Sequence, residues 1–284
     1  MSALFTATSE LRSGWKFAIF AIVLVIFFLI PGLLAALFIP GDFLIQHQFG
    51  INVAIQLLAG VAATLFMARF VDHQPLSTYG ISLHKGWLRD FAVGMVIAAG
   101  MLLVMVAACV VLGNIEMFWN GLSMLSALLA LTAILLGAAA FEEIVFRGYP
   151  LQALMKGIGA WPAAILMSIL FGIVHAGNPN ASRLGIINTI LAGGVLSAAY
   201  LKTRSLWFPY GIHLAWNAGL GLVLGFSLSG LNIASLWTTN VKGQEILTGG
   251  GYGPEGGIVG TIAFVTGVGL VGFYKNRNNN QETS

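Results

Sequence analysis

The chain has 284 residues, of which 58% are hydrophobic and only 8% are charged. An ordinary soluble domain carries about 25% charged residues, so the composition excludes a typical soluble protein and predicts one that lies in a membrane. The formal net charge of +3 is small, and the basic residues are scattered over several expected loops. Because nucleic-acid binding requires a clustered basic patch, we expect no nucleic-acid partner.

Apolar stretches long enough to cross a bilayer as helices recur along the whole chain. About eight are predicted, roughly at 16–39, 51–70, 91–112, 122–146, 160–176, 184–201, 206–228 and 256–274. The first is too long for the apolar region of a signal peptide, and no A-x-A-like cleavage site follows it, so we interpret it as a retained span. The sequence predicts an all-α membrane protein, a bundle of about eight transmembrane helices that forms a single polytopic domain over residues 1–284.

The distribution of lysine and arginine predicts the orientation of this bundle. With Arg147 set aside, the loops on one side hold Arg12, Lys16, Arg69, Lys85, Arg89, Lys156, Lys202, Arg204, Lys275 and Arg277. The other side holds Arg183 and Lys242. Because cytoplasmic loops are the richer in basic residues, both termini are expected to be cytoplasmic.

Three remaining features carry less information. Cys109 is the single cysteine, which excludes an intramolecular disulfide and a cysteine-type zinc site. The polar tail 275–284 is expected to be solvated and partly disordered. The longest connection, at about 229–255, contains "LTGGGYGPEGG" and faces the outside on this topology. Its glycine and proline content predicts irregular backbone, which we interpret as a surface loop, with a lid as the alternative.

The segment "AAAFEEIVFRGYP" places charges at the end of a long apolar run. Glu143 and Arg147 are four residues apart with the acid toward the N-terminus, which is the favourable order for an ion pair on a helix. Glu142 projects about 100° away from Glu143, so it is left for chemistry. An ionisable group inside a membrane is costly and is therefore a functional candidate; a solvated motif at the cytoplasmic interface is the alternative.

We expect this helix to continue through "LQAL" to the glycines Gly157 and Gly159, because the apolar pattern does not stop at the arginine. In an antiparallel helix pair joined at these glycines, Glu142 and His175 would lie at the same level, 15 residues before and 16 residues after the turn. A hairpin of two equal membrane spans would instead put His175 near the outer surface. Both arrangements fit the sequence.

Two further polar pairs have the spacing of one helix face. "FGIVH" places Phe171 and His175 together on the fifth span, and "HLAWN" places His213 and Asn217 together on the seventh. A lone histidine in a span is most often a hydrogen-bonded structural residue, but four polar residues on three helices would each need a buried partner. The candidate catalytic residues are therefore Glu142, His175, His213 and Asn217.

These residue types suit hydrolysis by an activated water. A carboxylate with a histidine beside it can take a proton from a water that attacks a carbonyl carbon, while a second histidine and an asparagine amide donate hydrogen bonds to the oxyanion. Alternatively, Glu142, His175 and His213 could bind a divalent metal such as zinc, with water in the open position. The H-E-x-x-H metalloprotease signature is absent from the sequence. Both versions stay open.

The blocks "EEIVFR", "FGIVH" and "HLAWN" resemble the E-E-x-x-x-R, F-x-x-x-H and H-x-x-x-N motifs of the CPBP family. This family comprises the type II CAAX prenyl endopeptidases and their bacterial relatives, also called the Abi family. The motif-bearing catalytic core would extend over 122–228. The resemblance implies an intramembrane endopeptidase in a bundle of eight helices.

The resemblance also implies a role for each motif residue. Glu142 would be the base that activates water, aided by His175, and His213 with Asn217 would form the oxyanion site. Three further motif positions would have supporting roles: Glu143, Arg147 and Phe171.

Eukaryotic members of this family cut after a prenylated cysteine, whereas some prokaryotic relatives are linked to bacteriocin processing or self-immunity. The resemblance therefore implies a peptide or protein substrate, lipidated or not, in the cytoplasmic membrane of a bacterium or archaeon. Two other functions stay open: a non-hydrolytic immunity or partner-binding protein, and a transporter whose buried charges relay protons or bind a solute. The lack of a detectable internal repeat disfavours the transporter, since many transporters are built from inverted halves.

Overall fold

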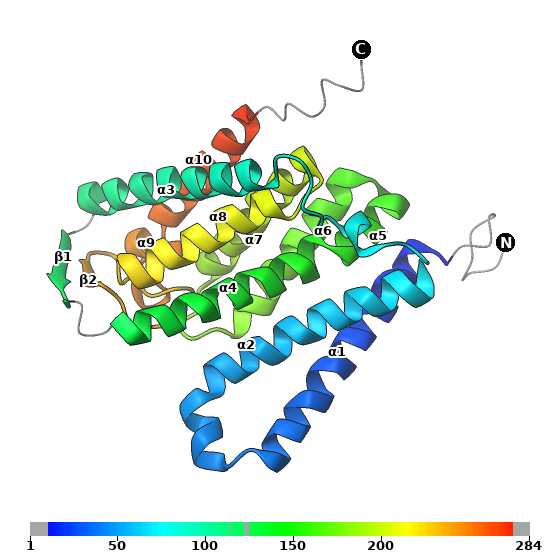
Figure 1. Cartoon of the computed structure of the whole chain (residues 1–284). Coiled ribbons are helices and arrows are strands. Elements are labelled where there is room, and N and C mark those ends of the chain that lie inside the picture. Colours follow the sequence, from blue (N-terminus) through cyan, green and yellow to red (C-terminus); the bar gives the residue numbers. More distant parts are fainter. Residues whose placement is uncertain (1–10, 113, 122–124, 275–284) are drawn as a thin grey trace. The chain divides into compact units, whose positions relative to one another are not determined.

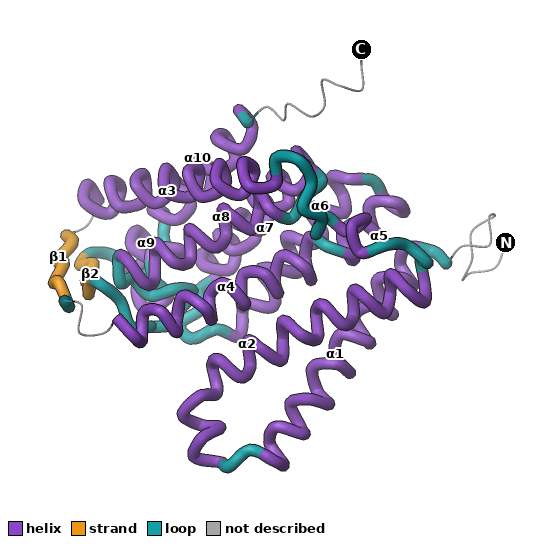
Figure 2. Tube along the Cα trace, in the orientation of Figure 1, coloured by secondary structure: helices purple, strands orange, loops and turns teal. Residues whose placement is uncertain are grey.

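The computed structural model describes residues 11–112, 114–121 and 125–274, most of which are helical (Figure 1 and Figure 2). Within these ranges, six helices are long and apolar enough to cross a membrane: Ser13–Phe38, Gly41–Val71, Trp87–Leu112, Leu125–Ile158, Ala160–Gly177 and Arg183–Thr203. Large apolar side chains such as Leu29, Leu103 and Val111 are exposed on them, as expected of helix faces in contact with lipid. The prediction of an all-α membrane protein is confirmed.

The described chain divides into two compact units. One comprises the chain up to Leu83 together with Ala133–Ala164, and the other comprises His84–Thr132 together with the chain from Ile165 onward. The first unit contains the acidic motif, and the second contains both histidine motifs. The single polytopic domain stays a prediction, and the expected tail at 275–284 lies outside the described residues.

In the first unit, α1 (Ser13–Phe38) and α2 (Gly41–Phe66) pack against each other as an antiparallel hairpin, drawn in blue in Figure 1. The two residues between them, Ile39 and Pro40, have extended backbone angles. Proline lacks the N–H that would continue the first helix, so the chain reverses here. At its other end α2 passes into a π-helical turn, Met67–Val71.

A buried polar cluster joins the two ends of this hairpin. The Nζ atom of Lys16 lies 2.6 Å from Oδ1 of Asp72, and the two side chains are 8% and 6% exposed. The hydroxyl of Tyr79, at the end of a 3-10 turn, donates a hydrogen bond to Asp72 Oδ2 at 3.0 Å. Burial, and then the neighbouring carboxylate, raise the pKa of Tyr79 above its ordinary value. Lys16 is therefore an ion-paired residue as well as one of the basic residues that predict the orientation.

The helix that carries the acidic motif is interrupted. Helix α4 (Leu125–Arg147) ends at the arginine, and a separate helix, α5 (Tyr149–Ile158), follows Gly148. The predicted continuation toward Gly157 and Gly159 is confirmed as one apolar span, Leu125–Ile158, but its helix is broken at the single residue Gly148. The comparison of levels between Glu142 and His175 stays a prediction, because the two residues belong to different units.

Local chemistry explains the interruption. Pro150 has no N–H to donate to the carbonyl of Phe146, and a proline disfavours helical backbone at the residue before it. At Gly148, an added Cβ would lie 2.3 Å from the carbonyl oxygen of Ile144. A residue with a side chain would clash there, so glycine permits the close turn between α4 and α5.

In the second unit, α3 (Trp87–Leu112) packs against α8 (Trp207–Asn217) and α10 (Ile258–Phe273), and α7 (Arg183–Thr203) packs against the same two helices. Figure 1 shows α3 and α8 running beside each other. Helix α6 (Ala160–Val174) begins in the first unit, belongs to the second from Ile165 onward and ends one residue before His175.

Glycines allow α3 and α8 to approach closely. A Cβ on Gly94 would lie 2.5 Å from the carbonyl oxygen of Phe208, and a Cβ on Gly211 would lie 2.2 Å from that of Phe91. Small residues at helix contacts are the usual way in which membrane helices pack their backbones together. This contact fixes α8, which carries His213 and Asn217.

The last two expected spans are shorter than predicted. The stretch at 206–228 forms α8 followed by a π-helical segment, Ala218–Val223, and the stretch at 256–274 forms α10, which has 16 residues. At 1.5 Å per residue, α10 is about 24 Å long, less than the roughly 30 Å of a bilayer core. The predicted number of about eight spans is therefore approximate.

A two-stranded antiparallel sheet was not expected from the sequence. It pairs β1 (Asn114–Trp119) with β2 (Trp237–Lys242), so that Trp119 lies opposite Trp237 with ring centroids 5.0 Å apart. The exposed pair Glu116 and Lys242 lies across the two strands at 2.6 Å. The connection at about 229–255, expected to be irregular, therefore contains a strand and also a short helix, α9 (Glu245–Thr248).

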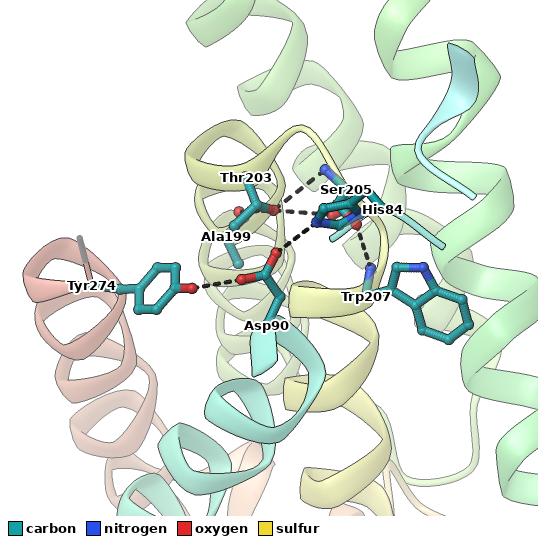
Figure 3. Close-up of polar contacts among 7 residues, drawn as sticks. All are labelled: His84, Asp90, Ala199, Thr203, Ser205, Trp207 and Tyr274. Atoms are coloured by element: carbon teal, nitrogen blue, oxygen red, sulfur yellow. Dashed lines mark hydrogen bonds and ion pairs between the residues drawn. The ribbon is translucent and has the colours of Figure 1, made fainter. Parts of the chain in front are cut away.

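A second polar cluster lies at the beginning of α3 (Figure 3). Asp90, which is 4% exposed, accepts a hydrogen bond from the hydroxyl of Tyr274 at 2.6 Å and lies 3.2 Å from Nε2 of His84. In the turn between α7 and α8, the backbone N–H of Trp207 donates to Oγ of Ser205 at 3.3 Å. These contacts hold the beginning of α3 against the residue that follows α10 and cap the beginning of α8.

Candidate active site

The acidic motif lies in the last turns of α4. Nη1 of Arg147 donates to Oε1 of Glu143 at 3.0 Å, and the two side chains are 0% and 1% exposed. The ion pair predicted from the spacing of four residues is confirmed. Removing either partner would leave the other as an uncompensated buried charge, so the pair braces the end of α4.

Glu142 differs from its neighbour in burial. The residue as a whole is half-buried, although its Oε2 atom is shielded from solvent. Because successive helical residues are rotated by about 100°, the carboxylate of Glu142 and that of Glu143 leave the helix in different directions. Arg147 donates to Glu143 and also interacts electrostatically with Glu142, which is the more exposed of the two acidic residues.

His175 begins a 3-10 turn at the end of α6. Its Nδ1 atom lies 2.7 Å from the carbonyl oxygen of Phe171. A carbonyl oxygen only accepts hydrogen bonds, so Nδ1 is the donor in this contact. The two rings are 4.6 Å apart, which confirms that both side chains share one face.

The ring of Phe171 connects the two histidine motifs. Its centroid lies 6.1 Å from that of His213, in an edge-to-face arrangement with an interplanar angle of 81°. Both side chains are buried, with residue exposures of 4% and 7%. The ring of Phe171 thus contacts both imidazoles, and its supporting role stays a prediction.

His213 and Asn217 lie one turn apart on α8, as their spacing predicts. The α-helix ends at Asn217, and the π-helical segment Ala218–Val223 begins at the next residue. Such π-helical turns occur often at functional sites. Asn217 is half-buried and is the last residue of the α-helix.

Glu255 is a buried acidic residue that the sequence analysis did not single out as part of the site. It is 7% exposed and accepts a hydrogen bond from Nε1 of Trp216, the neighbour of Asn217, at 2.7 Å. The available signal was an acid inside the glycine-rich "GYGPEGG" segment. This sequence feature does not indicate which residue donates a hydrogen bond to Glu255, because Trp216 lies 39 residues away in the chain.

The motif residues fall into two groups. Phe171, His175, His213 and Asn217 belong to the second unit, where ring contacts and one helix turn bring them together. The acidic motif belongs to the first unit. The meeting of Glu142 with the histidines therefore stays a prediction.

The metal alternative needs at least three clustered ligands. Over the ranges that the structure describes, no group of three or more His, Cys, Asp or Glu side chains is arranged to hold a metal ion. Because Glu142 belongs to the first unit and both histidines belong to the second, the metal-bound alternative stays a prediction.

A cavity of about 510 Å³ opens in the second unit near the beginning of α7. It is lined by Asn180, Ala181, Ser182, Arg183, Leu184, Glu245, Ile246, Gly249, Gly251 and Gly256. None of the motif residues is among these lining residues, so this cavity is distinct from the predicted catalytic residues.

Comparison with protein families supports the motif assignment. Residues 124–219 match the family model described as type II CAAX prenyl endopeptidase Rce1-like. No curated protein and no solved structure matches the chain. The matched segment includes all three motifs, from the first glutamate at position 142 to the asparagine at position 217. The family resemblance predicted from the motifs is therefore confirmed over residues 124–219, about a third of the chain.

Proposed function

We propose that the protein is a glutamate-dependent intramembrane endopeptidase that hydrolyses a peptide bond of a membrane-associated substrate. The observation that carries the proposal is the family match over residues 124–219, because this segment contains the acidic motif and both histidine motifs in order. The six apolar helices agree with catalysis inside a membrane.

In this mechanism, Glu142 takes a proton from water as the water oxygen attacks the carbonyl carbon of the scissile bond. The half-buried position of Glu142 and the engagement of Glu143 by Arg147 support this division of roles. His175 orients the water, since its Nε2 atom can accept a hydrogen bond while Nδ1 donates to the Phe171 carbonyl. General base catalysis of this kind contributes about 10²–10⁴-fold to the rate.

The attack produces a tetrahedral intermediate with a negatively charged oxygen. Asn217 donates an amide hydrogen bond to this oxyanion, and His213 donates a second one from its imidazole. Their separation by one turn of α8 and the contact of His213 with Phe171 support a pre-organised site. Glu142 then returns its proton to the leaving amine, which breaks the peptide bond.

The substrate is a peptide or protein, with or without a lipid chain, that reaches the site from the bilayer or from the cytoplasm. We place the enzyme in the cytoplasmic membrane of a bacterium or archaeon with both termini in the cytoplasm. The ten-to-two distribution of basic residues between the two sides supports this orientation.

The test compares protein termini in membranes from cells that express the wild type or Glu142→Gln at equal levels. The amide cannot take a proton, so we expect a set of new termini with the wild type and its loss in the variant. Glu245→Gln is the matched control, because it makes the same chemical change at an exposed residue outside the motifs.

Near-normal cleavage by folded Glu142→Gln would show that another group is the base. Identical termini in all three samples, with every protein folded and abundant, would favour the non-hydrolytic immunity or partner-binding function. A flux across vesicle membranes that requires Glu142 would favour the transporter.

A further inference from the structure

Both carboxylate oxygens of Glu255 are used by neutral donors. Oε1 accepts from the indole Nε1 of Trp216 at 2.7 Å. Oε2 accepts from the backbone N–H of Ser229 at 2.7 Å and from its hydroxyl at 2.8 Å. Short hydrogen bonds to an ionised acceptor are about twice as strong as neutral ones. Glu255 therefore joins three segments that are distant in the sequence: α8, the connection after the π-helical segment, and its own loop.

One branch of this network reaches the end of α8. Trp216 is 5% exposed, and its ring lies 5.0 Å from that of Phe264 on α10. It precedes Asn217 and lies three residues after His213, close to the same face of the helix. A bond from the indole to Glu255 therefore limits rotation of α8 about its axis, and that rotation determines where His213 and Asn217 point.

The other branch reaches the turn that contains His175. The side chain of Asn178 donates to the carbonyl of Ser229 at 3.1 Å, and its backbone N–H donates to the carbonyl of His175 at 3.1 Å. Ser229 has a φ of 46°, a conformation that residues other than glycine adopt rarely. Such backbone persists where its surroundings hold it, and here Glu255 accepts both donors of Ser229.

The loop that carries Glu255 is itself fixed from another side. Nδ2 of Asn188 donates to the backbone carbonyls of Glu255 and Gly257, each at 2.8 Å, and Thr261 donates to Oδ1 of Asn188 at 2.7 Å. The backbone of the loop is thus bound to α7 independently of the Glu255 carboxylate. This separation allows the loop and the carboxylate to be tested by different substitutions.

We propose that Glu255 is a positioning residue that aligns His213 and Asn217, through Trp216, and the His175 turn, through Ser229 and Asn178. The proposal rests on the proposed endopeptidase function for its effect on catalysis. Glu255 itself takes no part in the chemistry. Its carboxylate is suited to the task because it offers acceptors on both sides, whereas a glutamine would turn an N–H₂ group toward one set of donors.

The experiment uses the full-length protein in detergent micelles with ¹⁵N-labelled tryptophan. The resonance of the Trp216 indole N–H is assigned by its disappearance in Trp216→Phe. In Glu255→Gln we expect this resonance to move more than the other indole resonances, because its charged acceptor is lost. Asn188→Ala is the matched control: it releases the backbone of the same loop and leaves the carboxylate, so the Trp216 indole resonance should move less.

Cleavage is measured on the termini that distinguish wild type from Glu142→Gln, at equal amounts of folded protein. We expect Glu255→Gln and Trp216→Phe each to lower the rate by about 10–100-fold, since small misplacements of catalytic groups have effects of this size. The double variant should be no slower than the slower single one, because Glu255→Gln already disturbs the contact that Trp216→Phe removes. Asn188→Ala should keep a rate near that of the wild type once folded protein is matched.

Equal rate losses in Glu255→Gln and Asn188→Ala would reduce Glu255 to a structural residue and overturn the proposal. An unmoved indole resonance in Glu255→Gln would overturn the contact itself. If the wild type produces no specific termini, the proposed function fails, but the indole resonance still decides whether Glu255 holds Trp216.

Discussion

Two buried carboxylates of this protein are accommodated in opposite ways. Glu143, in the first unit, is paired with the guanidinium of Arg147 four residues along the same helix. Glu255, in the second unit, is held by the indole of Trp216 and by two donors of Ser229. The first arrangement cancels charge locally, whereas the second uses one charge to bring distant segments together.

This difference predicts which substitutions should lower the stability of the folded protein and which should lower the rate of catalysis. In the first unit, Lys16 and Arg147 neutralise buried acids, so removing a cation leaves a charge without compensation. In the second unit, the candidate site residues themselves carry two imidazoles and one amide, those of His175, His213 and Asn217. Deleting one of these should leave the fold intact and disturb chemistry instead.

The largest expected effect on stability follows from Arg147→Ala. This change leaves Glu143 buried without its cation and should lower the free energy of unfolding by about 3–5 kcal/mol. Thermal unfolding of the purified protein in detergent measures it. The double variant Glu143→Gln with Arg147→Gln should recover part of the loss, because no buried charge remains. A stable Arg147→Ala protein with a defect in rate alone would place Arg147 against the substrate instead.

The next effect should appear in rate. Asn217→Ala removes a proposed oxyanion donor and should slow the chemical step by about 10²–10³-fold, with little change in melting temperature because the side chain is half-buried. Single-turnover cleavage of a substrate identified from its new termini measures this step. Asn120→Ala, which removes hydrogen bonds beside the β1–β2 sheet, is the control and should leave the rate unchanged. A normal rate in Asn217→Ala would remove it from the oxyanion site.

The smallest effect concerns Tyr79, which donates to Asp72 in the first unit. Tyr79→Phe should lower the free energy of unfolding by about 1.5–3 kcal/mol at neutral pH, the range for hydrogen bonds to charged groups. Because the pKa of Tyr79 is raised on folding from its ordinary value of 10.0, this contribution is complete below pH 10. It is lost as the pH rises through the higher pKa of the folded state.

Unfolding of wild type and Tyr79→Phe, followed from pH 7 to about pH 11, measures the difference. The difference in the free energy of unfolding between the two proteins should become smaller toward the alkaline end of this range, because Tyr79 ionises first in the unfolded state. If the difference in the free energy of unfolding between the two proteins stays constant from pH 7 to about pH 11, ionisation of the Tyr79 hydroxyl does not cause the pH dependence. The comparison between the two units would then depend on the results for Arg147→Ala and Asn217→Ala alone.

Much of the fold follows from features that the sequence carries locally. The apolar stretches predict the helices, because a span needs about 20 apolar residues and satisfies its own backbone hydrogen bonds. The interruption after Arg147 was missed, although its cause is local, because the apolar pattern continues across Gly148 and Pro150. The pairing of β1 with β2 joins positions more than a hundred residues apart, and hydropathy does not reveal such pairing.

The contacts of the candidate site also divide into those that the sequence predicts locally and those that depend on tertiary packing. The sequence by itself determined the ion pair of Glu143 with Arg147, the shared face of Phe171 and His175, and that of His213 and Asn217, because each pair is spaced by one turn of a helix. Only the tertiary structure decided that Phe171 also contacts the imidazole of His213 and that Glu255 binds Trp216 and Ser229. These contacts depend on how helices and loops pack, and packing brings together residues that no periodicity relates.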